Sequence, residues 1–242
     1  AFDEVGSYDT IMVPAGTYTL DTATYGDIEH DDFLILVGEG AGTTIIQAAT
    51  TPATASTGVF NFDMSDYAIT LIGVTIRHGN NTSDYGGGIY AYGYGELSLI
   101  DCVVTENVGD YGGGIYAESS DSEWLLSVEL FNTTVSNNTA EYGGGIYFEA
   151  YSGNSALRLE NSTVNDNTST EYGGGIYFYS GDNYGTRVDI INSTIKNNTA
   201  DYGGGLYVEE YWGYTDIYLQ DSIFSGNTAT SDGGGVYIYE NY

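Results

Sequence analysis

The sequence predicts an all-β solenoid, and three observations support this fold class. A glycine triplet returns six times, each time followed by an aliphatic residue and a tyrosine. Apolar and polar residues alternate after each triplet, as in strands with one buried face. No segment has a helical period, and glycine costs a helix about 1 kcal/mol per residue. The triplets begin at Gly86, Gly112, Gly143, Gly173, Gly203 and Gly233, with spacings of 26, 31, 30, 30 and 30 residues.

Three short strands are expected in each coil. The first begins at the triplet, where Ile146 and Phe148 share one face of residues 145–149. A variable turn follows, and then a second strand with inward pairs such as Leu157 and Leu159. A polar corner leads to a short third strand with one apolar anchor. An asparagine stands three residues after each anchor, at Asn107, Asn138, Asn167, Asn198 and Asn227.

These elements predict a right-handed parallel β-helix of about eight coils, each with three strands and ~30 residues. We expect a single domain over residues 1–242, because one coil cannot bury its apolar face alone and stacked coils bury a continuous core. Residues 81–242 hold the regular repeats. Residues 1–80 are expected to form degenerate coils, since segments 11–18 and 33–37 also have the composition of strands.

The repeats resemble those of the pectate-lyase-like superfamily of right-handed β-helix proteins. More narrowly, they are similar to the repeats of polymorphic outer-membrane proteins and related surface proteins, which pair a GGA-plus-aliphatic motif with F-x-x-N. Here GGG precedes Ile, Leu or Val, and Phe224-x-x-Asn227 matches the second motif, while aliphatic residues replace the Phe in other coils. The resemblance covers the whole chain and implies the fold. It implies no single function, because the superfamily includes lyases, hydrolases, adhesins and structural proteins.

The charge balance limits the partners of the chain. It has 34 acidic and 4 basic residues, for a formal net charge of −30. Such a surface repels nucleic acid and anionic membranes, so we expect no nucleic-acid partner. No apolar stretch is long enough for membrane insertion. The single cysteine, Cys102, is expected in the core, and Ala1 is compatible with a mature secreted chain, which favours an extracellular or cell-surface location.

Outward residues of a parallel stack form columns, and one tyrosine column is complete over six coils. Stacked aromatic pairs add about 0.5–1.5 kcal/mol each, so one interpretation is a stabilising ladder. The other is a flat aromatic surface for glycans or for lateral association. A second tyrosine column, from Tyr85 to Tyr202, precedes the triplets. The first column consists of Tyr90, Tyr116, Tyr147, Tyr177, Tyr207 and Tyr237.

An acidic column stands beside the triplets. Carboxylates ~5 Å apart repel each other by roughly 1 kcal/mol in water. Bound Ca²⁺ would relieve this repulsion through carboxylate and carbonyl ligands, which makes the column a candidate calcium ladder and Ca²⁺ the one candidate cofactor. Diffuse counterions, or adaptation to high salt, are the alternative. The column consists of Asp84, Asp110, Glu141, Glu171 and Asp201.

N-x-S/T sequons recur at equivalent corners of the coils. Asn132, Asn161 and Asn192 are candidate glycosylation sites if the chain is secreted. The same residues are equally explained as corner ladders whose side chains bond the turn backbone. Further sequons begin at Asn80, Asn81, Asn137, Asn167 and Asn197.

No enzyme is expected, because the acidic residues repeat uniformly and do not converge on one place. The clusters most similar to catalytic groups, at residues 30–32 and 77–78, have the composition of turns. We expect an extracellular structural subunit that polymerises with itself, head to tail, into a surface filament, since residues 235–239 form an open strand edge. A cell-surface adhesin or glycan-binding module is the alternative. A polysaccharide lyase or hydrolase is the third hypothesis.

Overall fold

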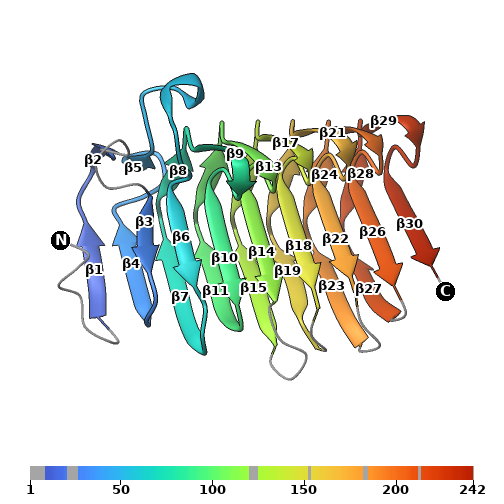
Figure 1. Ribbon diagram of the computed structural model, residues 1–242, viewed down its shortest axis with the longest axis horizontal. Helices are drawn as coiled ribbons and strands as arrows, with labels where there is room; N and C mark the ends of the chain where they lie inside the picture. The colour runs from blue at the N-terminus through green and yellow to red at the C-terminus, as the bar shows by residue number, and fades with distance from the viewer. Residues whose placement is uncertain are drawn as a thin grey trace.

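The computed structural model describes residues 9–20, 27–119, 125–151, 154–181, 185–211 and 214–241. Within these ranges the strands form four sheets, and every strand pair is parallel. The one helical element in the same ranges is a 3-10 turn, η2, at Pro52–Thr54. None of the helices described is long and apolar enough to cross a membrane. The coils stack along the long axis, with the chain termini at opposite ends (Figure 1).

Sheet A collects the strand that follows the variable turn of each coil. Its inward residues stack in register, so that Leu157 lies between Val128 and Val188. The strand order is β1 (Asp9–Val13), β4 (Leu34–Gly38), β7 (Tyr67–Ile72), β11 (Gly95–Ile100), β15 (Leu126–Phe131), β19 (Ala156–Glu160), β23 (Gly185–Ile191) and β27 (Tyr214–Gln220).

Sheet B follows a sharp corner and contains the short third strands. Each has one inward anchor, such as Val164, which is fully buried. The strand order is β2 (Gly16–Thr19), β5 (Thr44–Gln47), β8 (Thr75–Arg77), β12 (Val103–Thr105), β16 (Thr134–Ser136), β20 (Thr163–Asn165), β24 (Thr194–Lys196) and β28 (Ile223–Ser225).

Sheet C contains the strands that begin after the glycine triplets. Ile146 stacks on Ile176 and Phe148 on Phe178, with the two phenyl rings 5.1 Å apart. The strand order is β3 (Ile28–His30), β6 (Phe60–Asp63), β10 (Ile89–Gly93), β14 (Ile115–Ser119), β18 (Ile146–Ala150), β22 (Ile176–Ser180), β26 (Leu206–Tyr211) and β30 (Val236–Asn241).

Sheet D adds a fourth strand to the three expected in a regular coil. Its strands lie between the asparagine and the glycine triplet, and their buried residues are small, such as Ala140, Ser169 and Ala200. A strand that buries only small side chains has no apolar alternation, so its sequence gives no strand signal. The strand order is β29 (Thr228–Asp232), β25 (Thr199–Tyr202), β21 (Thr168–Tyr172), β17 (Thr139–Tyr142), β13 (Val108–Tyr111) and β9 (Asn80–Tyr85).

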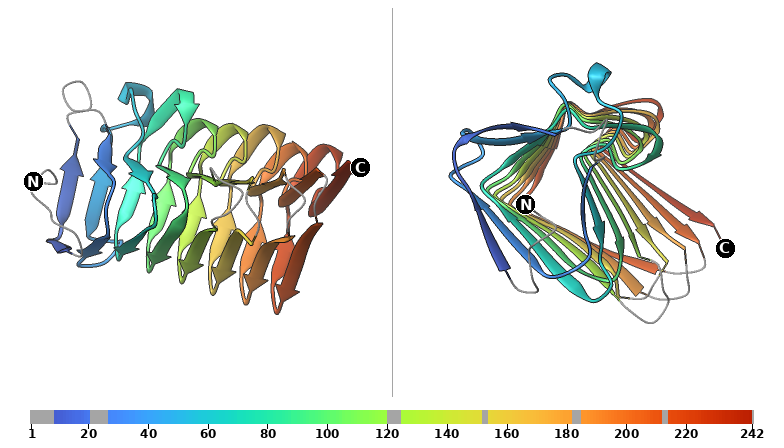
Figure 2. Two further views of the ribbon diagram at one scale, coloured as in Figure 1. Left: turned by 60° about the horizontal axis from the view of Figure 1, so that its bottom comes forward. Right: turned by 60° about the vertical axis from the view of Figure 1, so that its left-hand side comes forward.

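The apolar core runs without interruption along the axis. Side chains of sheets A, B and C fill the interior, from Leu34 in the second coil to Val208 in the seventh. The coils superimpose when the rod is viewed obliquely toward its N-terminal end (Figure 2). All three sheets contain eight strands each, in agreement with the number of coils that the repeat predicts.

Each regular coil turns three corners through residues in the left-handed backbone region. The corner between sheets A and B uses Asn or Asp at φ 48–54°, as at Asn132, Asn161 and Asn192. The next corner uses residues such as Asn197 at φ 55°. The third uses the first glycine of the triplet, where a Cβ would meet backbone atoms, as at Gly173. Asn, Asp and Gly are the residues that adopt this conformation at least cost.

Candidate functional site

A buried asparagine column occupies the corner between sheets B and D. In the first four asparagines of the column, Nδ2 donates to the Oδ1 of the next one, at 3.0–3.1 Å. The same Nδ2 donates to a backbone carbonyl, which for Asn167 is that of Val135 at 3.0 Å. A buried amide without partners costs about 1–3 kcal/mol, so these bonds hold the coils together. The column consists of Asn107, Asn138, Asn167, Asn198 and Asn227.

The candidate glycosylation residues lie at the corner between sheets A and B. Asn132, Asn161 and Asn192 are exposed, and the Nδ2 of Asn192 donates to the Oδ1 of Asn161. The Nδ2 of Asn132 likewise donates to Asp101, so these side chains bond neighbouring corner side chains, whereas the predicted bonds to the turn backbone are not among the hydrogen bonds described for them. Their exposure also leaves them accessible, and glycosylation at these positions stays a prediction. The sequon at Asn167 differs, because that side chain belongs to the buried column.

Cys102 takes the place of a hydroxyl residue in a second inner ladder. The ladder continues through Thr133, whose Oγ1 accepts the backbone N–H of Cys102 at 3.2 Å, and through Ser162. The cysteine Sγ lies 3.3 Å from the carbonyl oxygens of Leu71 and Ile100. Burial raises the pKa of the Cys102 thiol to about 11. The thiol is therefore protonated at neutral pH, and its contacts are structural.

The tyrosine column on the outer face of sheet C is not a flat exposed surface. Tyr116, Tyr147, Tyr177 and Tyr207 are only 1–5 % exposed. The second tyrosine column lies over them from the ends of the sheet D strands, with the ring of Tyr172 4.8 Å from that of Tyr207. The interpretation as a flat glycan-binding platform is therefore wrong for these four rings, because sheet D was not foreseen and it covers them. Tyr90 and Tyr237, at the two ends of the column, are half-buried.

Glutamates on the same face accept hydrogen bonds from the tyrosine hydroxyls. Tyr177 Oη donates to Glu209 Oε2 at 2.5 Å, and Tyr116 Oη donates to Glu118 at 3.1 Å and to Glu149. Burial, followed by the nearby Glu149 carboxylate, raises the pKa of Glu118. Burial is also the main cause that raises the pKa of Tyr116 and Tyr177 well above the ordinary value. The face thus combines protonated phenols with carboxylates.

The structure describes four of the five side chains of the acidic column. Burial, followed by repulsion from Glu141, raises the pKa of Asp110. Hydrogen bonds from Thr230 and Ser231 lower the pKa of Asp201. The side chain of Asp84 lies outside the described residues. Among the side chains that the structure does describe, no group of three or more His, Cys, Asp or Glu residues is placed to hold a metal ion, and calcium binding by the column stays a prediction.

The two clusters that resembled catalytic groups border surface pockets, since His30 and Asp31 line one and His78 and Glu106 another. His30 is in register with Phe62 of the core, and its Nε2 is buried without a hydrogen-bond partner. His78 stands at a left-handed corner, where Nδ1 lies 3.1 Å from the carbonyl of Ala49 and Nε2 2.9 Å from Glu106. The absence of enzyme activity stays a prediction.

Two grooves open on the outer face of sheet C. The N-terminal groove, of about 530 Å³, combines Tyr90 and Tyr92 with the acidic residues Glu29, Asp31 and Asp63. The C-terminal groove, of about 390 Å³, is named the tyrosine groove here. Its lining consists of Tyr172, Tyr202, Tyr207, Glu209, Tyr211, Tyr237 and Tyr239. The alternation of Glu and Tyr in the outward column was visible in the sequence, but the walls from sheet D were not.

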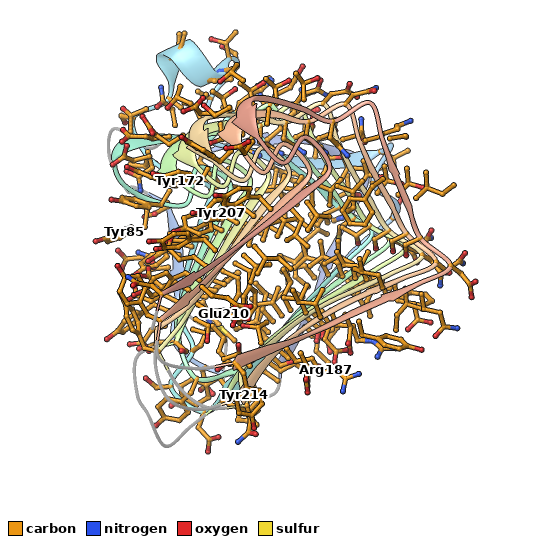
Figure 3. All side chains as sticks on the ribbon, turned by 90° about the vertical axis from the view of Figure 1, so that its right-hand side faces the viewer. Tyr85, Tyr172, Arg187, Tyr207, Glu210 and Tyr214 are labelled. Atoms are coloured by element: carbon orange, nitrogen blue, oxygen red, sulfur yellow. The ribbon has the colours of Figure 1, made fainter. Side chains whose placement is uncertain are left out.

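The few basic residues lie away from these grooves. Arg187 Nε pairs with Asp189 at 2.7 Å on the outer face of sheet A, where Arg158 also pairs with Asp189 at 3.8 Å. Figure 3 shows Arg187 on a different face of the rod from Tyr172 and Tyr207. Arg77 and Lys196 belong to sheet B. In the described part of the chain, no ion pair neutralises a carboxylate on the outer face of sheet C.

A family model for a right-handed β-helix region matches residues 35–242. The chain belongs to the right-handed β-helix family. No curated protein and no solved structure matches it. The family accounts for the fold of this β-helix, whereas the narrower likeness to the pectate-lyase-like superfamily and to surface-protein repeats remains a likeness of motifs. The surfaces of this β-helix therefore provide the observations that bear on its function.

Proposed function

We propose that this β-helix is an extracellular structural subunit that polymerises head to tail into a surface filament. The exposed inner layer of the last coil carries the proposal. Leu219 and Ile238 point inward like their equivalents Ile190 and Val208 one coil earlier. The earlier pair is fully buried, whereas Leu219 is 45 % and Ile238 48 % exposed. A further coil stacked on this layer, whether from a second copy or from more of the same chain, would remove both from water, and we propose that a second copy supplies it.

The backbone at the same end supports the proposal. β27, β28, β29 and β30 each have a neighbour on one side only. Such edges pair readily with another strand. β1, β2 and β3 form the opposite edges of sheets A, B and C, so a second copy can continue three sheets in the same parallel direction. A contact between two different ends does not close on itself, and it therefore produces a filament.

An extracellular location belongs to the same proposal. It is supported by the acidic composition and by the motif likeness to surface-protein repeats. The net charge of −30 opposes contact between copies. Screening at ~0.15 M salt limits this repulsion to about 8 Å, so association should strengthen as salt is added. Filaments would then form most readily at physiological or higher ionic strength.

The test is the assembly state of the purified chain. Light scattering after size exclusion and electron microscopy at physiological salt should show particles longer than one subunit. Leu219→Lys should abolish them, because a charge would be buried at the contact at a cost of several kcal/mol. The matched control is Ser225→Lys, which adds the same charge to an outward position of the same coil, in register with Lys196. Monodisperse single rods under all conditions would overturn the proposal.

Surface adhesion is the second candidate function. It is favoured by the two grooves on the side of the rod, which combine tyrosines with carboxylates. Retention of the single chain on cell-wall or cell-surface preparations, lost on substitution of groove tyrosines, would support this function. Retention that is unaffected by those substitutions would exclude the grooves.

A further inference from the structure

The tyrosine groove is concave because its aromatic rings are inclined to one another. Its floor consists of outward residues of β26 and β30, and one wall consists of Tyr172 and Tyr202 at the ends of two sheet D strands. The rings of Tyr172 and Tyr202 are tilted by 45°, and those of Tyr202 and Tyr237 by 60°, whereas Tyr207 is stacked on Tyr172 and on Tyr237 in the floor of the groove. A sugar ring stacks best on a flat platform, whereas rings at several inclinations surround a compact, rounded group.

Glu209 gives the groove a negative charge. Its carboxylate accepts the hydroxyl of Tyr177 and has no cationic side chain within ion-pair distance among the residues described. Burial, with the Glu209 carboxylate as a further cause, raises the pKa of Tyr207. Tyr207 itself is 5 % exposed and stacked between Tyr172 and Tyr237, so a cation would meet the more exposed rings around it, such as that of Tyr239. The overall charge of −30 adds a long-range attraction for cations.

We propose that the tyrosine groove binds a small quaternary ammonium ion. Aromatic rings attract a cation placed over their faces by ~0.5–2 kcal/mol each, and more when the site excludes water. The methyl groups of a quaternary ammonium ion pack against the rings, while its charge lies near Glu209. A primary ammonium ion fits less well, because it would have to give up strong hydrogen bonds to water. The side chains of the site point outward from sheet C, but Tyr237 and Tyr239 stand on β30, the edge that a stacked copy would contact, so binding is measured on the single rod.

The first experiment compares three probes by calorimetric titration at constant ionic strength. Choline is the quaternary ammonium probe, and 3,3-dimethyl-1-butanol is its uncharged isostere. n-Butylammonium tests attraction by charge alone. We expect choline to bind at least about tenfold more tightly than either, which corresponds to ~1.4 kcal/mol. Equal binding of the neutral isostere or of butylammonium would overturn the proposal, and so would tighter binding of a neutral oligosaccharide.

Variants of the groove locate the site. Glu209→Gln should weaken choline binding about fivefold or more, or ~1 kcal/mol. The matched control is Glu129→Gln, which removes the same charge from the outer face of sheet A and should leave the affinity unchanged. Tyr239, 41 % exposed and in register with Glu209, allows a second comparison. Tyr239→Phe should bind choline normally and Tyr239→Leu should not.

The outcomes of these experiments distinguish a failure of the choline site from a failure of the proposed filament. Leu219→Lys, the variant that should prevent stacking, is expected to bind choline as the unsubstituted chain does. Unchanged binding in both Glu209→Gln and Tyr239→Leu, with normal circular dichroism, would place any choline site elsewhere and overturn the proposal. If Glu209→Gln does not fold, the Tyr239 pair decides the question, because the Tyr239 side chain is exposed on the outer face of β30 and lies outside the buried core.

Discussion

At the scale of single residues, the third glycine of each triplet shows how one coil limits its neighbours. A Cβ on Gly175 would lie 2.5 Å from the carbonyl oxygen of Gly205 and 2.9 Å from the Nδ2 of Asn198. The backbone of the next coil and the asparagine column thus both contact, from two directions, the position that this Cβ would occupy. Two motifs that look separate in the sequence, GGG and the corner asparagine, are therefore one packing arrangement.

This arrangement predicts opposite results for one substitution at two equivalent positions. Gly175→Ala should lower the free energy of unfolding by about 2 kcal/mol or more, because overpacking typically costs ~1–3 kcal/mol. In the single, unassembled rod, Gly235→Ala should be neutral or stabilising by up to ~1 kcal/mol, because nothing lies within 4 Å of its Cβ position. Urea denaturation of both variants checks this prediction. Equal losses at the two positions would contradict it.

At the scale of elements, sheet D determines which tyrosines on the outer face of sheet C are buried. The rings of Tyr147 and Tyr177 lie 4.5 Å apart, and those of Tyr116 and Tyr147 5.1 Å apart, in a continuous stack. Burial is the main cause that raises the pKa of each of these tyrosines. A second apolar cluster thus runs beside the main core, on the other side of sheet C.

The buried stack predicts a steep loss of stability at alkaline pH. Unfolded tyrosines release their protons near pH ~10, whereas the buried ones keep them, so the folded state holds more protons above that pH. Stability is therefore fully present below pH ~10 and falls above it, by ~1.4 kcal/mol per pH unit for each buried tyrosine. Phenolate absorbance near 295 nm and circular dichroism, followed together, check this.

The two signals should change together, and Tyr147→Phe with Tyr177→Phe should make the loss shallower. Ionisation of all tyrosines near pH 10 in a chain that stays folded would contradict the prediction.

At the scale of the whole molecule, the rod carries a strong excess of negative charge. Four basic residues cannot neutralise 34 acidic ones, and those that form ion pairs do so on sheet A. Acidic columns along a parallel stack repeat at the strand spacing of ~4.8 Å, so the repulsion between neighbours is built into the repeat. Dissolved cations must therefore contribute to the stability of the folded chain.

Salt should raise the melting temperature of the single rod. We expect a rise of several degrees between about 0.01 M and 1 M NaCl, since the screening length falls from ~30 Å to ~3 Å. Equal rises with CaCl₂ and MgCl₂ at equal concentration would favour diffuse counterions over a calcium ladder. A rise specific to Ca²⁺ that is lost in Glu141→Gln would instead identify the predicted calcium ladder.

Much of the fold was accessible from sequence because the repeat places equal residues in equal positions. The inward residues Ile146, Phe148 and Leu157 are all fully buried, as their alternation predicts. Sheet D was missed because the residues that it buries are alanine, serine and glycine, which also occur in turns. The tyrosine groove was missed for the same reason, since two of its tyrosines come from sheet D strands.

The sequence by itself determined that the chain is a parallel solenoid with one continuous core, because the spacing of the triplets and the alternation after them are local properties. It also determined the excess of negative charge. Only the tertiary structure decided which outward residues remain exposed, because exposure depends on what another sheet places over them. Tyr177 and Tyr179 are both outward tyrosines of β22, yet Tyr177, which contacts Tyr172 at the end of a sheet D strand, is 5 % exposed, whereas Tyr179 is half-buried.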